Sequence, residues 1–128
     1  MKLLADTHLL LWGAENSTRA SKTARRLLDD PDSQVWFSAA SIWEVAIKRA
    51  RGRADFEVDP MLLRRGLLAN DWRELPVTGE HAAGVLALPP IHKDPFDRLL
   101  IAQAQLEGLT LLTSDRAVAK YPGAIRKV

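Results

Sequence analysis

Short apolar segments alternate with segments of helical periodicity along the chain, and this alternation restricts the fold more than any other feature. The predicted strands are residues 2–5, 34–37, 73–77, 109–113 and 124–126. The predicted helices are residues 7–13, 21–30, 41–51, 59–67, 78–88 and 94–108, with a short helix after Asp115. Strands that alternate with helices form a parallel sheet covered on both faces, so we predict an α/β fold. Since 128 residues make one ordinary domain, residues 1–128 are predicted to be a single domain.

Several helix ends carry recognisable capping residues. Asp59-Pro60 and Asp94-Pro95 each pair an N-cap acid with a proline suited to the first helical position. Ser21 and Thr78 are predicted to cap two further helices. The helix that begins after Asp94 is apolar nearly all round, so we expect it to be packed on more than one side.

Composition excludes several classes of protein and of site. The chain has no cysteine, so disulfides and thiolate metal sites are excluded. No apolar run approaches the roughly 20 residues that cross a bilayer, and Asp6 comes too early for a signal peptide, so we expect a cytoplasmic protein without membrane attachment. The net charge of +2 is too small for a basic coat that binds nucleic acid, although residues 48–53 form a local basic cluster.

Acidic residues follow or neighbour the predicted strands. Asp6 directly follows the first strand, Glu44 lies in the helix after the second, and Asp115 comes two residues after the fourth. Ligands of such sheets bind outside the carboxyl ends of the strands, where these three acids are expected. Asp97 lies in the first turn of a helix, and spacing alone leaves its position open.

Each acid also has an ordinary structural explanation. Asp6, Asp97 and Asp115 are placed where they could serve helix capping, and Glu44 could form an ion pair with Lys48 at i,i+4. Together, however, carboxylates in one crevice would repel one another and lose hydration unless a cation neutralised them. Oxygen ligands favour hard cations, so the pattern indicates a divalent metal site for Mg²⁺ or Mn²⁺. We expect no ligand role for His8, His81 or His92.

Four segments in order resemble the PIN domain family, and most closely its VapC-type toxins. These are residues 3–8 (LLADTH), 38–48 (SAASIWEVAIK), 92–104 (HKDPFDRLLIAQA) and 111–115 (LLTSD). The resemblance extends from residue 3 to about residue 127. It implies a three-layer α/β/α domain whose five-stranded parallel sheet has the order 3-2-1-4-5.

The resemblance further implies a magnesium-dependent endoribonuclease, the toxin of a toxin–antitoxin pair, that hydrolyses RNA phosphodiester bonds with a metal-activated water. Asp6, Glu44 and Asp97 would hold the principal metal, and Asp115 would support it or a second ion. Small polar or acidic groups expected to orient these ligands are Thr7, Ser41, Asp94 and Thr113. Cations expected to steer the RNA backbone are Lys48, Arg49, Arg51, Arg53 and Arg98.

The resemblance to this family also implies binding partners, and other functions stand as alternatives. The family implies an RNA substrate, a cognate antitoxin whose tail crosses the acidic groove, and a homodimer. The alternatives are a structure-specific DNase and a catalytically inactive PIN module that binds nucleic acid or protein. An aspartyl phosphatase is disfavoured because His8 stands where such enzymes usually carry a second acid. The four tryptophans, Trp12, Trp36, Trp43 and Trp72, are predicted mostly in the core or an interface, with base stacking as the alternative.

Overall fold

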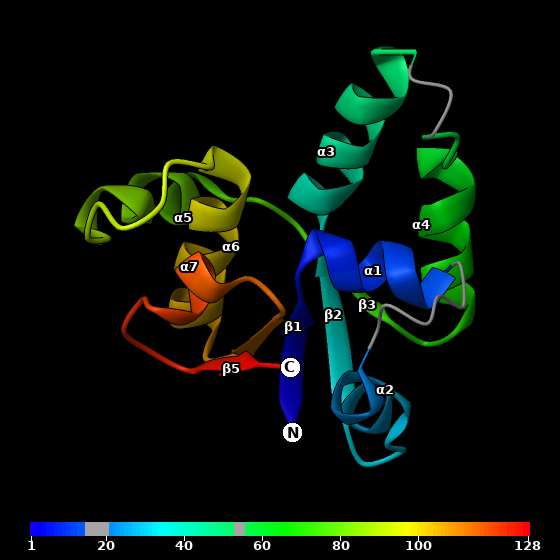
Figure 1. The fold of residues 1–128 in the computed structure, drawn as a ribbon, viewed down its shortest axis with the longest axis horizontal. Helices are drawn as coiled ribbons and strands as arrows, with labels where there is room; N and C mark the ends of the chain where they lie inside the picture. The colour runs from blue at the N-terminus through cyan, green and yellow to red at the C-terminus, as the bar shows by residue number, and fades with distance from the viewer. Residues whose placement is uncertain (15–20, 53–55) are drawn as a thin grey trace.

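In the computed structural model, which describes residues 1–14, 21–52 and 56–128, five strands form one parallel sheet (Figure 1). The strands are β1 (Lys2–Ala5), β2 (Gln34–Ser38), β3 (Arg73–Leu75), β4 (Thr110–Thr113) and β5 (Ile125–Lys127). Their order is β3-β2-β1-β4-β5, and every neighbouring pair is parallel. The predicted α/β fold and strand order are therefore confirmed.

Helices cover both faces of this sheet (Figure 1). One side carries α1 (Thr7–Ala14), α2 (Lys22–Asp29), α3 (Ala39–Ala50) and α4 (Pro60–Ala69). The other side carries α5 (Gly79–Gly84), the short 3₁₀ helix η1 (Val85–Ala87), α6 (Pro95–Glu107) and α7 (Arg116–Ala119). Within the described ranges, no helix has the length and apolar character needed to cross a membrane.

The pleat of β1 divides the apolar core into two parts. Successive side chains of a strand point to opposite faces. Leu3 and Ala5 accordingly pack with α1 to α4, and Leu4 packs with α6. β1 thus lies between two buried layers. Asp6 directly follows β1 and α3 directly follows β2, so both lie at the carboxyl edge of the sheet.

Several element boundaries differ from the predictions, and some of these differences have a local cause. β3 ends at Leu75 rather than at residue 77, because Pro76 has no N–H to continue a ladder. α3 begins at Ala39, two residues earlier than predicted, because Ser38 Oγ accepts the N–H of Ala40 at 3.0 Å. α1 extends one residue beyond the predicted end, to Ala14. α5 ends at Gly84 rather than at residue 88, because the chain continues as the 3₁₀ helix η1.

The predicted helix caps of α2, α4, α5 and α6 are confirmed. Ser21, Asp59, Thr78 and Asp94 each accept backbone N–H groups from the following turn. α6 ends at Gly108, whose φ of 67° is a left-handed conformation that favours glycine. As predicted, α6 packs on several sides, against α3, α5, α7 and β4.

Candidate active site

Asp6 is buried at the end of β1 and has a partner for each carboxylate oxygen. The residue is only 3% exposed. Oδ1 accepts the N–H of Leu9 at 2.9 Å, which caps the first turn of α1, and Oδ2 accepts the hydroxyl of Thr113 at 2.6 Å. Burial raises the pKa of Asp6 above its ordinary value, and these two hydrogen bonds oppose the rise. Holding Asp6 ionised at neutral pH therefore costs free energy that a nearby cation would offset.

Glu44 lies in the second turn of α3 and is oriented by Thr7 from the start of α1. Thr7 Oγ1 lies 2.8 Å from Glu44 Oε1 and 2.9 Å from Ser41 Oγ. A hydroxyl has a single proton, so Thr7 donates to the carboxylate and accepts from Ser41. Glu44 Oε2 pairs with Lys48 at 3.2 Å, the i,i+4 ion pair that the sequence allowed.

Asp97 lies in the first turn of α6, close enough to Glu44 for their charges to interact. Its Oδ2 is 2.9 Å from His92 Nε2. Burial, followed by the charge of Asp94, raises the pKa of Asp97 to about 6, with a further rise from Glu44 and an opposing hydrogen bond from His92. The start of α6 lies near α3, because the rings of Phe96 on α6 and Trp43 on α3 are in contact with centroids 5.3 Å apart. Spacing alone had left this placement open.

Asp115 and Asp94 are helix caps beside these acids. Asp115 Oδ1 accepts the N–H groups of Ala117 and Val118 at 2.7 and 3.2 Å, and Asp94 Oδ1 accepts those of the first turn of α6. Thr113 connects the last acid to the first, because its Oγ1 donates to Asp6 and accepts the N–H of Asp115 at 3.0 Å. Asp6, Thr113 and Asp115 thus form one hydrogen-bonded chain across the ends of β1 and β4.

The donor set suits a hard cation, although the acids do not all converge on one point. In the described part of the chain, the metal-ligating side chains whose ligand atoms lie within 4.8 Å of one another are His92, Asp94 and Asp97. Asp6 and Glu44 belong to no such group, since Glu44 is turned toward Thr7 and Lys48. The carboxyl groups come from several elements, and the pKa is raised for two of them, Asp6 and Asp97. Oxygen ligands of this kind fit Mg²⁺ or Mn²⁺.

His92 is the neighbour of the acids that sequence reasoning set aside. It lies in the loop before α6, where its backbone N–H donates to the hydroxyl of Tyr121 at 2.7 Å. That contact holds the loop so that the imidazole reaches Asp97. The sequence signals were its position five residues before Asp97 and its place at the start of segment 92–104, but a loop has no periodicity that would predict the contact.

The cations predicted to steer RNA differ in their exposure and in the bonds that their side chains make. Lys48 pairs with Glu44, Arg49 donates to the carbonyl of Glu57, and Arg51 is exposed. Arg98 points inward, where its guanidinium donates to the carbonyls of Pro89 and Val85 and to the hydroxyl of Tyr121 at 2.9 to 3.2 Å. These bonds give Arg98 a structural task in fixing the segment before α6. Arg53 lies outside the described residues.

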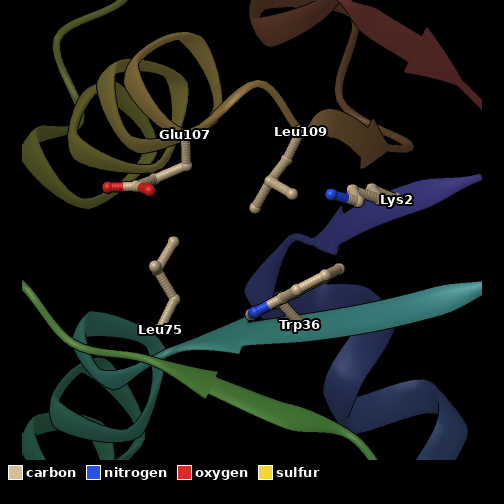
Figure 2. Close-up of a pocket in the computed structure, with 5 residues that line it drawn as sticks. All are labelled: Lys2, Trp36, Leu75, Glu107 and Leu109. Carbon is tan, nitrogen blue, oxygen red and sulfur yellow. The ribbon is translucent and has the colours of Figure 1, made fainter.

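A pocket of about 200 Å³ lies away from the acids, between the end of α6 and the sheet (Figure 2). Figure 2 shows its lining side chains, Lys2, Trp36, Leu75, Glu107 and Leu109. Lys2 begins β1 whereas Asp6 follows its end, so pocket and acids are at opposite ends of that strand. Its lining is mostly apolar and brings no group of acids together.

Comparisons with known proteins agree with this geometry. The model of the family described as PIN domain matches residues 3–124. Ribonuclease VapC22 of Mycobacterium tuberculosis is 30% identical over 120 residues, which cover 93% of this chain and 91% of that protein.

Solved structures share the whole fold at low sequence identity. VapBC2 from Rickettsia felis, bound to a DNA fragment from their promoter, superposes with a TM-score of 0.73 at 10% identity, over 100% of this chain and 99% of that chain. A toxin-antitoxin complex from Klebsiella pneumoniae gives 0.67 at 19% identity, over 98% and 99%. The family match over nearly the full length, together with the 30% identical relative, shows that this chain belongs to the PIN domain family, as a VapC-type member.

Proposed function

We propose that this chain is an endoribonuclease that depends on Mg²⁺ or Mn²⁺ and acts as the toxin of a toxin–antitoxin pair. The observation that carries the proposal is the buried Asp6, which Thr113 joins to the backbone N–H of Asp115, while the neighbouring Thr7 donates to Glu44. Asp97 in turn lies close enough to Glu44 for their charges to interact. Support for the substrate comes from the similarity to Ribonuclease VapC22. The proposed metal ligands are Asp6, Glu44 and Asp97, with Asp115 in support.

The proposed mechanism assigns separate tasks to the residues around these acids. A bound divalent cation would supply a lowered pKa for the attacking water and stabilise charge on the phosphoryl oxygen. Thr113 and the N–H of Leu9 hold the carboxylate of Asp6 in one orientation, and Thr7 does the same for Glu44. Arg51, exposed at the end of α3, would attract the RNA backbone.

The proposed partners rest on the similar structures. The fold is shared with the VapBC2 structure and the toxin-antitoxin complex, so we propose a cognate antitoxin that binds this chain. A basic side chain of that antitoxin placed against the carboxylates would compete with the metal for them. The homodimer and the cytoplasmic location stay predictions, and light scattering of the purified chain would test the first.

Cleavage assays on matched RNA and DNA substrates test the proposal. The purified chain should cut single-stranded RNA with magnesium present and stop when EDTA is added. Asp6→Asn keeps an oxygen for the N–H of Leu9 but removes the charge, so activity should fall by more than the roughly 10–100-fold that loss of an outer ligand partner costs. Asp59→Asn, an exposed cap on α4, is the matched control and should retain activity. Cleavage of branched DNA alone, or full activity in Asp6→Asn, would overturn the assignment.

A further inference from the structure

Two of the acids proposed to hold the metal are oriented by a side-chain hydroxyl from another element. Thr113 of β4 donates to Asp6 at 2.6 Å, and Thr7 of α1 donates to Glu44 at 2.8 Å. Such bonds restrict the rotation of a carboxylate and keep its other oxygen directed at a cation. Asp97 needs an equivalent donor if its carboxylate is to be held in the same way.

His92 supplies that donor from the loop before α6. Its Nε2 lies 2.9 Å from Asp97 Oδ2. A carboxylate only accepts hydrogen bonds, so the ionised Asp97 requires the hydrogen to be on Nε2. A ring nitrogen that carries a hydrogen has no lone pair for a metal, so Nε2 acts on the acid and not on a cation. Within residues 1–14, 21–52 and 56–128, this is the one hydrogen bond to the side chain of Asp97, and its Oδ1 is left for a cation.

The backbone of His92 is anchored by Tyr121, which follows α7. The hydroxyl of Tyr121 accepts the backbone N–H of His92 at 2.7 Å and donates to its carbonyl oxygen at 3.2 Å. Tyr121 is only 4% exposed, and its hydroxyl also accepts a hydrogen bond from Arg98 at 3.0 Å. One buried hydroxyl thus bonds both backbone groups of His92, which restricts the positions that the imidazole can take.

We propose that His92 is a positioning residue that holds the carboxylate of Asp97 in the orientation needed for the metal, with Tyr121 as its anchor. The inference rests on the proposed function and deepens it, because it concerns the same metal site. It requires that His92 acts on the cation only through Asp97. Loss of such an outer partner typically lowers metal affinity about 10–100-fold.

Manganese binding measures this role without any cleavage of RNA. Electron paramagnetic resonance follows free Mn²⁺ while the full chain is titrated, and circular dichroism checks that each variant is folded. His92→Leu removes the donor but keeps a side chain of similar size, so it should weaken Mn²⁺ binding by about 10–100-fold. His92→Gln keeps an N–H group at the end of its side chain and should recover most of this loss. Ile91→Ala, which removes a 41% exposed apolar side chain from the same loop, is the control and should change nothing.

A double variant separates positioning from direct binding of the metal. If His92 acts through Asp97, adding His92→Leu to Asp97→Ala should weaken Mn²⁺ binding no further than Asp97→Ala does alone. An equal loss in both backgrounds would make His92 an independent ligand and overturn the proposal. A spin-echo coupling of bound Mn²⁺ to an imidazole nitrogen that disappears in His92→Leu would overturn it as well.

The remaining outcomes separate this proposal from the general one. Tyr121→Phe removes only the hydroxyl and should weaken Mn²⁺ binding in the same direction as His92→Leu; an unchanged affinity would refute the anchoring. If the parent chain binds Mn²⁺ and Asp6→Asn does not, but His92→Leu binds it as tightly as Ile91→Ala, the positioning role is wrong and the proposed metal site stands. If the parent chain neither binds Mn²⁺ nor cuts RNA, the proposed function itself fails, and this inference fails with it.

Discussion

Replacing Asp97 by asparagine should stabilise the protein at neutral pH when EDTA is present. Its side chain is only 19% exposed, and burial together with Asp94 raises its pKa from 3.8 to about 6. The folded chain therefore holds a proton that the unfolded chain has released between about pH 4 and pH 6. The resulting stability is fully present below pH 3.8 and is lost as the pH rises through about 6.

The size of the effect follows from the pKa difference. Roughly two pKa units at about 1.4 kcal/mol each give a ceiling near 3 kcal/mol. Because the carboxylate keeps some contact with water, we expect the free energy of unfolding of Asp97→Asn to exceed that of the parent by about 1–3 kcal/mol at pH 7.5. In a chain of this length that corresponds to a rise in Tm of roughly 4–10 °C. At pH 4 the two proteins should be nearly equally stable.

Urea unfolding followed by circular dichroism at both pH values measures this difference. Asp59→Asn is the matched control, because it also removes an N-cap charge and asparagine caps equally well, so its effect should stay below about 0.5 kcal/mol. Magnesium should narrow the gap between Asp97→Asn and the parent, since a cation offsets the carboxylate charge only in the parent. Equal or lower stability of Asp97→Asn at pH 7.5 in EDTA would refute the reasoning.

Two further substitutions test contacts that distant segments make. Arg98→Met removes the guanidinium that bonds two carbonyls and Tyr121, so we expect about 2–4 kcal/mol lower stability by urea unfolding; unchanged stability with weaker RNA binding would instead favour a role in steering RNA. Gln103→Met removes the buried amide that bonds Ser38 at 2.6 Å, and thermal unfolding should show a loss of about 2–3 kcal/mol. The exposed Gln105→Met should cost less than about 1 kcal/mol, and an equal loss in both would contradict the importance of burial.

The network around Gln103 illustrates a part of the site that the sequence could not reveal. Ser38 caps α3, which carries Glu44, and donates to Gln103 of α6, which carries Asp97. The amide of Gln103 also lies 3.3 Å from His81 Nδ1, and His81 Nε2 is 2.8 Å from Glu107. Gln103 lies in an apolar helix, where the sequence offers no sign that its amide finds partners in three other segments. Only the packing of α6 against β2 and α5 brings them together.

The sequence by itself determined the features that depend on near neighbours. One such feature is the alternation of strands and helices. The capping roles of Asp59, Thr78 and Asp94 and the pair of Glu44 with Lys48 are others, and they join residues at most four positions apart. Local backbone geometry is enough to bring such groups into contact. The positions of the acids after their strands followed from the same local pattern, since parallel strands end at a common edge.

The tertiary structure alone decided which distant groups meet and how deeply they are buried. Thr113 bonds Asp6 across 107 residues, and Arg98 turns inward to bond Tyr121. His92 contacts Asp97 in a loop that is also bonded to Tyr121. Trp43 is exposed on α3 although the next residue, Glu44, is buried. These outcomes depend on strand register and on the packing of two core layers, and neither quantity is present in the spacing of residues along the chain.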